Sequence, residues 1–576
     1  MDIIVEKNLC VDAGDGTNLA TDVYRPAGGA PVPALVLRSP YNKERLSQGD
    51  TLRIVQAGFA VVSQDTRGSF ASAGAFCPFA EESGDGAATI AWAAAQPWSS
   101  GKVGSIGASY VGATQWLAAA TAPPALLAMA PNITAVDYYD CWTYQGGAFQ
   151  LGFNLSWALS FALAEVQRRL LPGHVSPAAN EPVLTAIDDI QALYAHLPLV
   201  DMPLLRELAP YYIEWLEHPS YDSFWRRIAP REVYERVTAP ALNIGGWFDG
   251  FLRGTLANYR GMKQRGGSEA ARRQQRLLIG PWSHGNFGGF FQDRAYGIRG
   301  AADVADLTGA QIRWFDRRLK GIDNGVDQER PVRIFVMGLD RWREEDDWPL
   351  PDTQFRPYYL HSAGTANSIA GTGALTTEPP GDEPEDAYLY DPRRPVPTTG
   401  GATLLPGGTI AANAGPRDQR EVERRDDVLC YTTPPLERPV EVTGPIELVL
   451  YVASSARDTD FTGALVDVAP DGRSLLLTDG ILRARYRESF SAPALLEPHH
   501  IYELRIDLGA TSMVFGAGHR LRLTITSSNF PRFDRNTNTG GDIAREGAAE
   551  FRQAINRVYH DGAHPSHLRL PCIERE

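Results

Sequence analysis

The chain has 576 residues, which is too long for a single hydrophobic core, so two or three domains are expected. Its 43% hydrophobic and 22% charged residues are typical of a soluble globular protein and exclude a disordered one. The formal net charge of -14 argues against nucleic acid or an anionic membrane as a partner, because either would need a basic face.

The start of the chain lacks the basic and apolar regions of a signal peptide, and no later window approaches the ~20 apolar residues of a membrane span. We therefore expect a cytoplasmic protein. The cysteines are odd in number and contain no Cys-x-x-Cys, so neither a disulfide framework nor a zinc ribbon is indicated. We expect all five to be buried apolar residues: Cys10, Cys77, Cys141, Cys430 and Cys572.

Strands and helices alternate along the first part of the chain. A hairpin turning at Asp15-Gly16 comes first. Apolar strands are then predicted over 34–37 and 60–63, and helices over 52–57 and 85–96. This rhythm predicts a parallel sheet covered by helices.

Residues 103–112 form the most informative motif, because an apolar strand runs into Gly107-Ala108-Ser109 and an alanine-rich helix follows. This is the pattern of a nucleophile elbow, which exposes one side chain, here Ser109, above the sheet. The second glycine of the usual pattern is replaced by Val111, and a glycine follows one residue later at Gly112. Taken alone, the motif also fits a serine that caps a helix.

The strand pattern disappears between about Tyr138 and Val237, where apolar residues recur at helical spacing, and a helical cap is expected. The α/β rhythm resumes with strands over 241–244 and 277–279 and a helix over 308–319. Alternating strands joined by Gly, Pro and Asp turns then predict a β-sandwich. We expect three domains: a split α/β-hydrolase domain over 1–137 and 239–350, a helical cap over 138–238, and a sandwich over 351–576.

Two residues fit the rest of a serine-hydrolase triad. In α/β-hydrolases an acid and a histidine follow the serine in that order, each after the carboxyl end of a strand, and Asp249 and His284 meet this test. A serine needs an imidazole to take its proton, and the imidazole needs a carboxylate to fix its tautomer. Separately, Asp249 also fits a helix N-cap and His284 a hydrogen-bonding loop residue.

The oxyanion site is less evident from the sequence. The backbone N–H of Tyr110, just after the serine, is one expected donor. The His-Gly-Gly loop that often supplies the second donor is absent, and Tyr41 stands at its place. Its hydroxyl is a candidate donor, and a packing role for this tyrosine is left open.

Five motifs together resemble the CocE/NonD hydrolases, the cocaine esterase-like enzymes of the X-Pro dipeptidyl-peptidase (S15) group. They are residues 38–41 (Arg-Ser-Pro-Tyr), 64–68 (Gln-Asp-Thr-Arg-Gly), 107–112 (Gly-Ala-Ser-Tyr-Val-Gly), 246–249 (Gly-Trp-Phe-Asp) and 280–284 (Gly-Pro-Trp-Ser-His). Residues 518–523 and 527–536 resemble the C-terminal jelly-roll domain of that family, so the resemblance covers essentially the whole chain.

The resemblance implies a triad and an oxyanion hole formed by Ser109, Asp249, His284, Tyr41 and the Tyr110 N–H, with no cofactor. It also implies an acyl pocket where the three domains meet, lined by Trp157, Phe251, Leu404 and Leu405, although Trp157 also fits a helix-packing residue. The implied activity is cleavage of a small-molecule carboxylic ester through an acyl-enzyme; a homodimer is left open.

Relatives that hydrolyse α-amino-acid esters carry acidic residues at the second and third positions after the catalytic aspartate. Here Phe251 and Leu252 occupy those positions, followed by Arg253, so a neutral or aromatic acyl group is favoured over an ammonium. Glu165 of the cap is a carboxylate that could replace them. An X-Pro dipeptidyl-peptidase or amidase is therefore the alternative, and a non-catalytic carbohydrate-binding protein is the least favoured class.

Two other patterns receive structural interpretations. Asp65 follows a strand, but it precedes the serine, and we expect a structural pair with Arg67. Three histidines near the C-terminus lack a recurrent ligand spacing, so surface histidines are favoured over a metal site: His560, His564 and His567.

Overall fold

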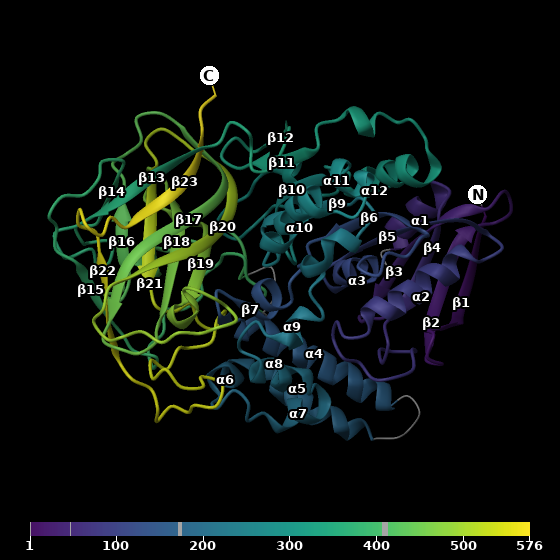
Figure 1. Ribbon diagram of the computed structural model, residues 1–576, viewed down its shortest axis with the longest axis horizontal. Coiled ribbons are helices and arrows are strands. Elements are labelled where there is room, and N and C mark those ends of the chain that lie inside the picture. The colour runs from purple at the N-terminus through teal and green to yellow at the C-terminus, as the bar shows by residue number, and fades with distance from the viewer. Residues whose placement is uncertain (1, 46–47, 171–175, 406–412, 576) are drawn as a thin grey trace.

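The structure is a computed structural model that describes residues 2–45, 48–170, 176–405 and 413–575 (Figure 1). In Figure 1 a β-sandwich lies on the left, an α/β unit on the right, and a group of helices below and between them. Within the described residues, no helix combines the length and the apolar character needed to cross a membrane.

The α/β unit is built on a 10-stranded sheet with the order β1-β2-β4-β3-β5-β6-β9-β10-β11-β12. The pairs from β4 through to β11 are parallel. This confirms the parallel sheet of the expected α/β-hydrolase fold. The strands are β1 (Ile3–Asp12), β2 (Asn18–Pro26), β3 (Val32–Ser39), β4 (Ala60–Asp65), β5 (Ser99–Ala108), β6 (Leu126–Asn132), β9 (Leu242–Phe248), β10 (Arg276–Ser283), β11 (Val332–Val336) and β12 (Arg341–Glu345).

Helices cover both faces of this sheet, because alternate strand residues point to opposite sides. On one face Val36 packs with residues of α2, α3, α10 and α11, and on the other Leu35 packs with residues of α1 and α12. The helices are α1 (Gln48–Gln56), α2 (Glu82–Ala94), α3 (Tyr110–Ala119), α10 (Leu252–Arg265), α11 (Glu269–Arg273) and α12 (Leu307–Phe315). The last predicted helix, over 308–319, is confirmed, and its C-terminal part is a π-helical turn, Asp316–Lys320, that continues α12.

The chain between β6 and β9 is mainly helical, as predicted, and its longest helix is α4 (Leu151–Leu170). A short hairpin that the sequence did not indicate precedes α4, with strands β7 (Tyr144–Gln145) and β8 (Ala148–Phe149). The other helices are α5 (Glu181–Asp188), α6 (Ile190–Ala195), α7 (Pro203–Leu208), α8 (Tyr211–Glu217) and α9 (Ser223–Arg226).

The C-terminal part is the expected β-sandwich, whose strands pair antiparallel except for β14 with β16. Its core also includes Trp247 and Phe248 of β9, so the two units share apolar contacts. The strands are β13 (Gln354–His361), β14 (Ala374–Thr376), β15 (Asp386–Tyr390), β16 (Leu429–Thr432), β17 (Val440–Ser454), β18 (Asp460–Val468), β19 (Ser474–Arg483), β20 (Tyr502–Phe515), β21 (Arg520–Thr526), β22 (Ala554–Tyr559) and β23 (His567–Ile573).

Three sequence interpretations are corrected by side-chain environments. Cys10 and Cys77 are exposed, not buried. His560 is fully buried in the sandwich, not on the surface, because two carboxylates stabilise it there. Its Nε2 lies 2.9 Å from Asp386 Oδ2 and its Nδ1 lies 3.2 Å from Glu383 Oε2.

We expect the buried pair of His560 and Asp386 to make stability depend on pH. Burial lowers the pKa of His560, but its hydrogen bond to Asp386 and the nearby carboxylates outweigh this, so the pKa is raised above its ordinary value of 6.5. A histidine whose pKa is raised in the folded state stabilises the fold fully at pH values below its unfolded-state pKa. This contribution is lost as the pH rises through its folded-state pKa.

The replacement His560→Gln should therefore lower the free energy of unfolding by about 3 kcal/mol at about pH 5.5 and by less at about pH 9. Urea unfolding at both pH values measures this difference. His564→Gln is the matched control, because His564 is partly exposed and its side chain bonds to Asp561 within its own turn. An equal loss for His560→Gln at both pH values would contradict a charged pair.

Candidate active site

Ser109 lies in the sharp turn between β5 and α3. Its φ of 60° and ψ of -125° are strained for a residue with a side chain. The turn is held by hydrogen bonds, since Ser109 N donates to Asn132 O at 2.9 Å and Ser109 O accepts from Gly112 N at 2.9 Å. This backbone projects the serine hydroxyl above the carboxyl end of the sheet, as the elbow pattern predicts.

The shifted glycine of the elbow has a packing explanation. A Cβ atom at Gly112 would lie 2.7 Å from Thr134 Cβ, so only glycine lets α3 approach the segment after β6 this closely. Thr134 Oγ1 uses this proximity to donate to Ser109 O at 2.8 Å. Val111 instead packs against Gly107, where an added Cβ would lie 2.2 Å from Val111 Cγ1.

Asp249 and His284 lie at the ends of the neighbouring parallel strands β9 and β10, on the same edge of the sheet as Ser109. His284 Nδ1 lies 2.7 Å from Asp249 Oδ1, and His284 Nε2 lies 2.9 Å from Ser109 Oγ. Asp249 is buried, whereas the His284 side chain is 15% exposed. This chain of hydrogen bonds can pass the serine proton to the imidazole while the carboxylate stabilises the imidazolium.

Tyr41 and Tyr110 are the candidate oxyanion donors near Ser109. The Tyr41 hydroxyl lines the same cavity as Ser109 and accepts a hydrogen bond from Trp157 Nε1 at 3.1 Å. Burial raises the pKa of Tyr41 to about 12, so the hydroxyl keeps its proton at neutral pH and can donate it. Tyr110 is the first residue of α3, where backbone N–H groups have no partner within the helix.

A cavity of about 590 Å³ opens above Ser109. Trp157 and Leu404 are among its lining residues, whereas Phe251 is not, and its ring lies edge-on to His284 with the ring centroids 5.0 Å apart. Leu405 is not among the lining residues, because it packs against Gly152 of α4. The remaining lining residues are Pro40, Tyr41, Arg45, Phe70, Phe153, Ser156, Ser160, Phe161, Leu163, Ala164, Gln167 and Ile187.

The lining also includes aromatic residues that the sequence analysis missed. Phe153 and Phe161 flank Trp157 at intervals of four along α4, so all three project from one face of that helix. This spacing is visible in the sequence and is the signal that could have found them. It gives one wall of the cavity a row of three aromatic side chains.

The described residues that line this cavity include no carboxylate. Glu165 is not among them, and its carboxylate is held by Arg168 and Arg169, each with a shortest contact of 2.8 Å. Arg253 pairs with Asp507 of the sandwich at 3.0 Å. Neither side chain is therefore free to act on a substrate in the cavity.

The expected pair between Asp65 and Arg67 is wrong. Arg67 instead contacts Asp85 at 2.6 Å and Asp15 at 2.8 Å. Asp65 lies at the end of β4, and its carboxylate accepts hydrogen bonds from two backbone N–H groups. These are the N–H of Lys43 at 2.6 Å and that of Ala71 at 3.2 Å. Within the described part of the chain, no group of three or more His, Cys, Asp or Glu residues is arranged to hold a metal ion.

Comparisons with known proteins cover both halves of the chain. Residues 15–286 match the X-Pro dipeptidyl-peptidase (S15 family) model, and residues 324–569 match the X-Pro dipeptidyl-peptidase C-terminal non-catalytic domain. A cocaine esterase of Rhodococcus sp. (strain MB1 Bresler) is 43% identical over 99% of both chains. A putative serine esterase of Mycobacterium bovis is 27% identical over 97% of this chain and 94% of its own.

Two solved structures share the whole architecture. An aminopeptidase from the marine sediment archaeon Thaumarchaeota archaeon has a TM-score of 0.83 at 25% identity, covering 100% of this chain and 97% of its own. An α-amino acid ester hydrolase has a TM-score of 0.79 at 25% identity, covering 99% and 97%. Both align along the α/β unit, the helical segment and the sandwich.

Proposed function

The chain belongs to the CocE/NonD hydrolases of the X-Pro dipeptidyl-peptidase (S15) family, and we propose that it is a serine esterase acting on carboxylic esters of small apolar or aromatic acids. The observation that carries this proposal is His284, which bonds Ser109 on one side and Asp249 on the other at the floor of an aromatic cavity. The proposed division into a split α/β domain, a cap and a sandwich is supported by the change of secondary structure near residues 138, 239 and 351.

The reaction follows from the geometry of these groups. Ser109 Oγ attacks the ester carbonyl carbon while His284 Nε2 takes the hydroxyl proton. The negative charge that develops on the carbonyl oxygen is stabilised by the Tyr41 hydroxyl and the Tyr110 N–H. Collapse of this intermediate breaks the ester C–O bond, and His284 returns the proton to the leaving alcohol. A water molecule then cleaves the acyl-enzyme by the same sequence, releasing the acid and restoring Ser109.

The preference for a neutral acyl group is supported by the charges around the cavity. A substrate ammonium would lose its hydration without gaining a carboxylate partner, which is costly in a partly buried site. The aromatic side chains of α4 favour a planar or apolar acyl group instead. An X-Pro dipeptidyl-peptidase or amidase activity is the alternative, and the similarity to an archaeal aminopeptidase is the observation that favours it.

A fluorophosphonate probe tests the catalytic class directly, since it labels a serine only where that serine is activated. We expect a single labelled peptide that contains Ser109, and no label on Ser109→Ala. An unlabelled wild-type protein that is folded by circular dichroism would exclude a serine hydrolase, and labelling at another serine would exclude the assigned nucleophile.

A matched pair of esters tests the acyl preference. The p-nitrophenyl esters of phenylacetic acid and of phenylglycine differ only in the α-ammonium group. We expect kcat/KM to be on the order of tenfold or more higher for phenylacetate, because the desolvated ammonium costs at least about 1.4 kcal/mol in the transition state. An Xaa-Pro p-nitroanilide should react more slowly than either. Faster cleavage of the phenylglycine ester or of the anilide would support the peptidase alternative.

A further inference from the structure

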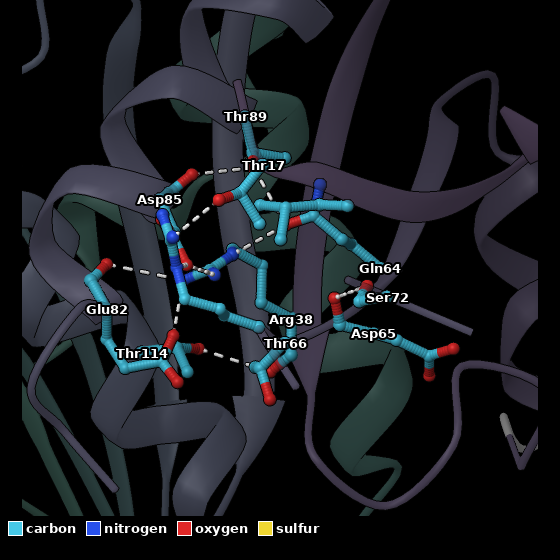
Figure 2. A network of polar contacts seen from close by, with 12 residues as sticks. Thr17, Arg38, Gln64, Asp65, Thr66, Ser72, Glu82, Asp85, Thr89 and Thr114 are labelled. Atoms are coloured by element: carbon cyan, nitrogen blue, oxygen red, sulfur yellow. Dashed lines mark hydrogen bonds and ion pairs between the residues drawn. The ribbon is translucent and has the colours of Figure 1, made fainter. Parts of the chain in front are cut away.

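A buried cluster of charged residues includes Arg38, Glu82 and Asp85 (Figure 2). Arg38, at the end of β3, is 2% exposed, and Glu82 in the first turn of α2 is 4% exposed. Arg38 Nη1 donates to Glu82 Oε2 at 2.5 Å, and its Nε donates to Gln64 Oε1 at 2.8 Å. Its remaining nitrogen, Nη2, lies 3.5 Å from Asp85 Oδ2.

The second oxygen of Glu82 leads from this cluster to the oxyanion site. Glu82 Oε1 accepts a hydrogen bond from the Tyr110 hydroxyl at 2.9 Å. The same hydroxyl accepts from the backbone N–H of Phe79 at 2.8 Å. The far end of the Tyr110 ring is therefore held by two hydrogen bonds, while its backbone N–H is the proposed oxyanion donor. Because the ring and the N–H belong to one residue, fixing the hydroxyl restricts the conformations that Tyr110 can adopt.

Arg38 is also connected to the second donor. It precedes Tyr41 by three residues, and the intervening Ser39 accepts a hydrogen bond from Tyr41 N at its Oγ, at 3.0 Å. The Arg38 carbonyl oxygen accepts from Thr114 Oγ1 of α3 at 3.3 Å. The strand that leads into the Tyr41 loop and the helix that carries Tyr110 thus meet at this arginine.

The cluster pairs opposite charges. Arg38 faces Glu82 and Asp85, and Asp85 also pairs with Arg67 at 2.6 Å. Burying such groups is expensive, and apolar residues of the same volume would often give equal or greater stability. A buried ion pair does, however, fix direction as well as distance, because the guanidinium donates along a rigid planar fork. This property suits residues that align the two proposed oxyanion donors, the Tyr41 hydroxyl and the Tyr110 N–H.

We propose that Glu82 and Arg38 are positioning residues of the oxyanion hole, acting through the Tyr110 hydroxyl on one side and the Tyr41 loop on the other. The proposal rests on the esterase function proposed above. It predicts that cutting the link between Glu82 and Tyr110 lowers transition-state stabilisation without weakening substrate binding.

The test variant is Tyr110→Phe, which keeps the ring and the backbone N–H but removes the hydroxyl. We expect kcat to fall on the order of tenfold with KM unchanged, because a small misplacement of a donor is enough to reduce its effect. The affinity for an arylboronic acid, whose tetrahedral adduct with serine imitates the intermediate, should fall by the same factor. Tyr212→Phe is the matched control, because this buried hydroxyl in the same aromatic cluster has no hydrogen-bond partner among the described residues.

A second variant separates positioning from stability. Glu82→Gln keeps an oxygen for the Tyr110 hydroxyl but removes the charge that faces Arg38. It should therefore lower the thermal midpoint more than Tyr110→Phe does, and lower kcat less, at a temperature where both variants are folded. If Tyr110→Phe keeps the wild-type kcat and boronate affinity, or if kcat follows thermal stability across the two variants, the positioning role is wrong. Fluorophosphonate labelling of the wild-type protein distinguishes this failure from a failure of the esterase assignment.

Discussion

Replacing Ser109 by alanine should lower kcat for p-nitrophenyl esters on the order of 10⁵-fold while the fold stays intact. The Ser109 hydroxyl bonds to His284 and lines the cavity, so its removal leaves no gap in the core. The strained backbone of the elbow is retained, since alanine meets the same steric limit at a φ of 60°. Steady-state kinetics with circular dichroism measures both quantities.

The same experiment extends to His284→Ala, for which we expect a loss almost as large. The double variant Ser109→Ala/His284→Ala should be no worse than the worse single variant, because each group acts only through the other. Multiplicative losses would show that the two residues act independently, which the 2.9 Å hydrogen bond between them argues against. A Ser109→Ala protein with wild-type kcat would show that another nucleophile is used.

Much of the fold was predictable because it depends on local patterns. The alternation of apolar strands and helices indicated the parallel sheet. Ser109, Asp249 and His284 follow one another in the order of a hydrolase triad, and each comes directly after a predicted strand. Parallel strands bring their carboxyl ends to one edge, so these three side chains lie close together. His284 Nδ1 lies 2.7 Å from Asp249 Oδ1, and His284 Nε2 lies 2.9 Å from Ser109 Oγ. Their catalytic roles, the three domain boundaries and a homodimer stay predictions.

The parts that the sequence did not indicate depend on contacts between distant residues. Arg67 pairs with Asp15, which is 52 residues away along the chain, and not with its neighbour Asp65. His560 is stabilised by Asp386, 174 residues away, so its burial could not be inferred from spacing. The elbow motif identified Ser109 but carried no sign of Glu82, because the carboxylate reaches Tyr110 only after α2 has packed beside α3.

Tyr41→Phe should lower kcat by about 10²–10³-fold, or about 3–4 kcal/mol of transition-state stabilisation, with little change in KM. The Tyr41 hydroxyl accepts a hydrogen bond from Trp157 Nε1, which leaves its own proton available for the oxyanion. Because burial raises the pKa of Tyr41 to about 12, the hydroxyl keeps this proton at neutral pH.

The structure adds a control for this prediction. Tyr41→Phe leaves the Trp157 N–H without its acceptor, so thermal stability should fall slightly, by about 1 kcal/mol. Trp157→Phe removes that N–H while Tyr41 keeps its hydroxyl, and it should therefore retain most of kcat. If Tyr41 only packs in the turn, Tyr41→Phe should keep a near-normal kcat. The ratio of kcat between these two variants decides whether the hydroxyl stabilises the oxyanion or only fills space beside it.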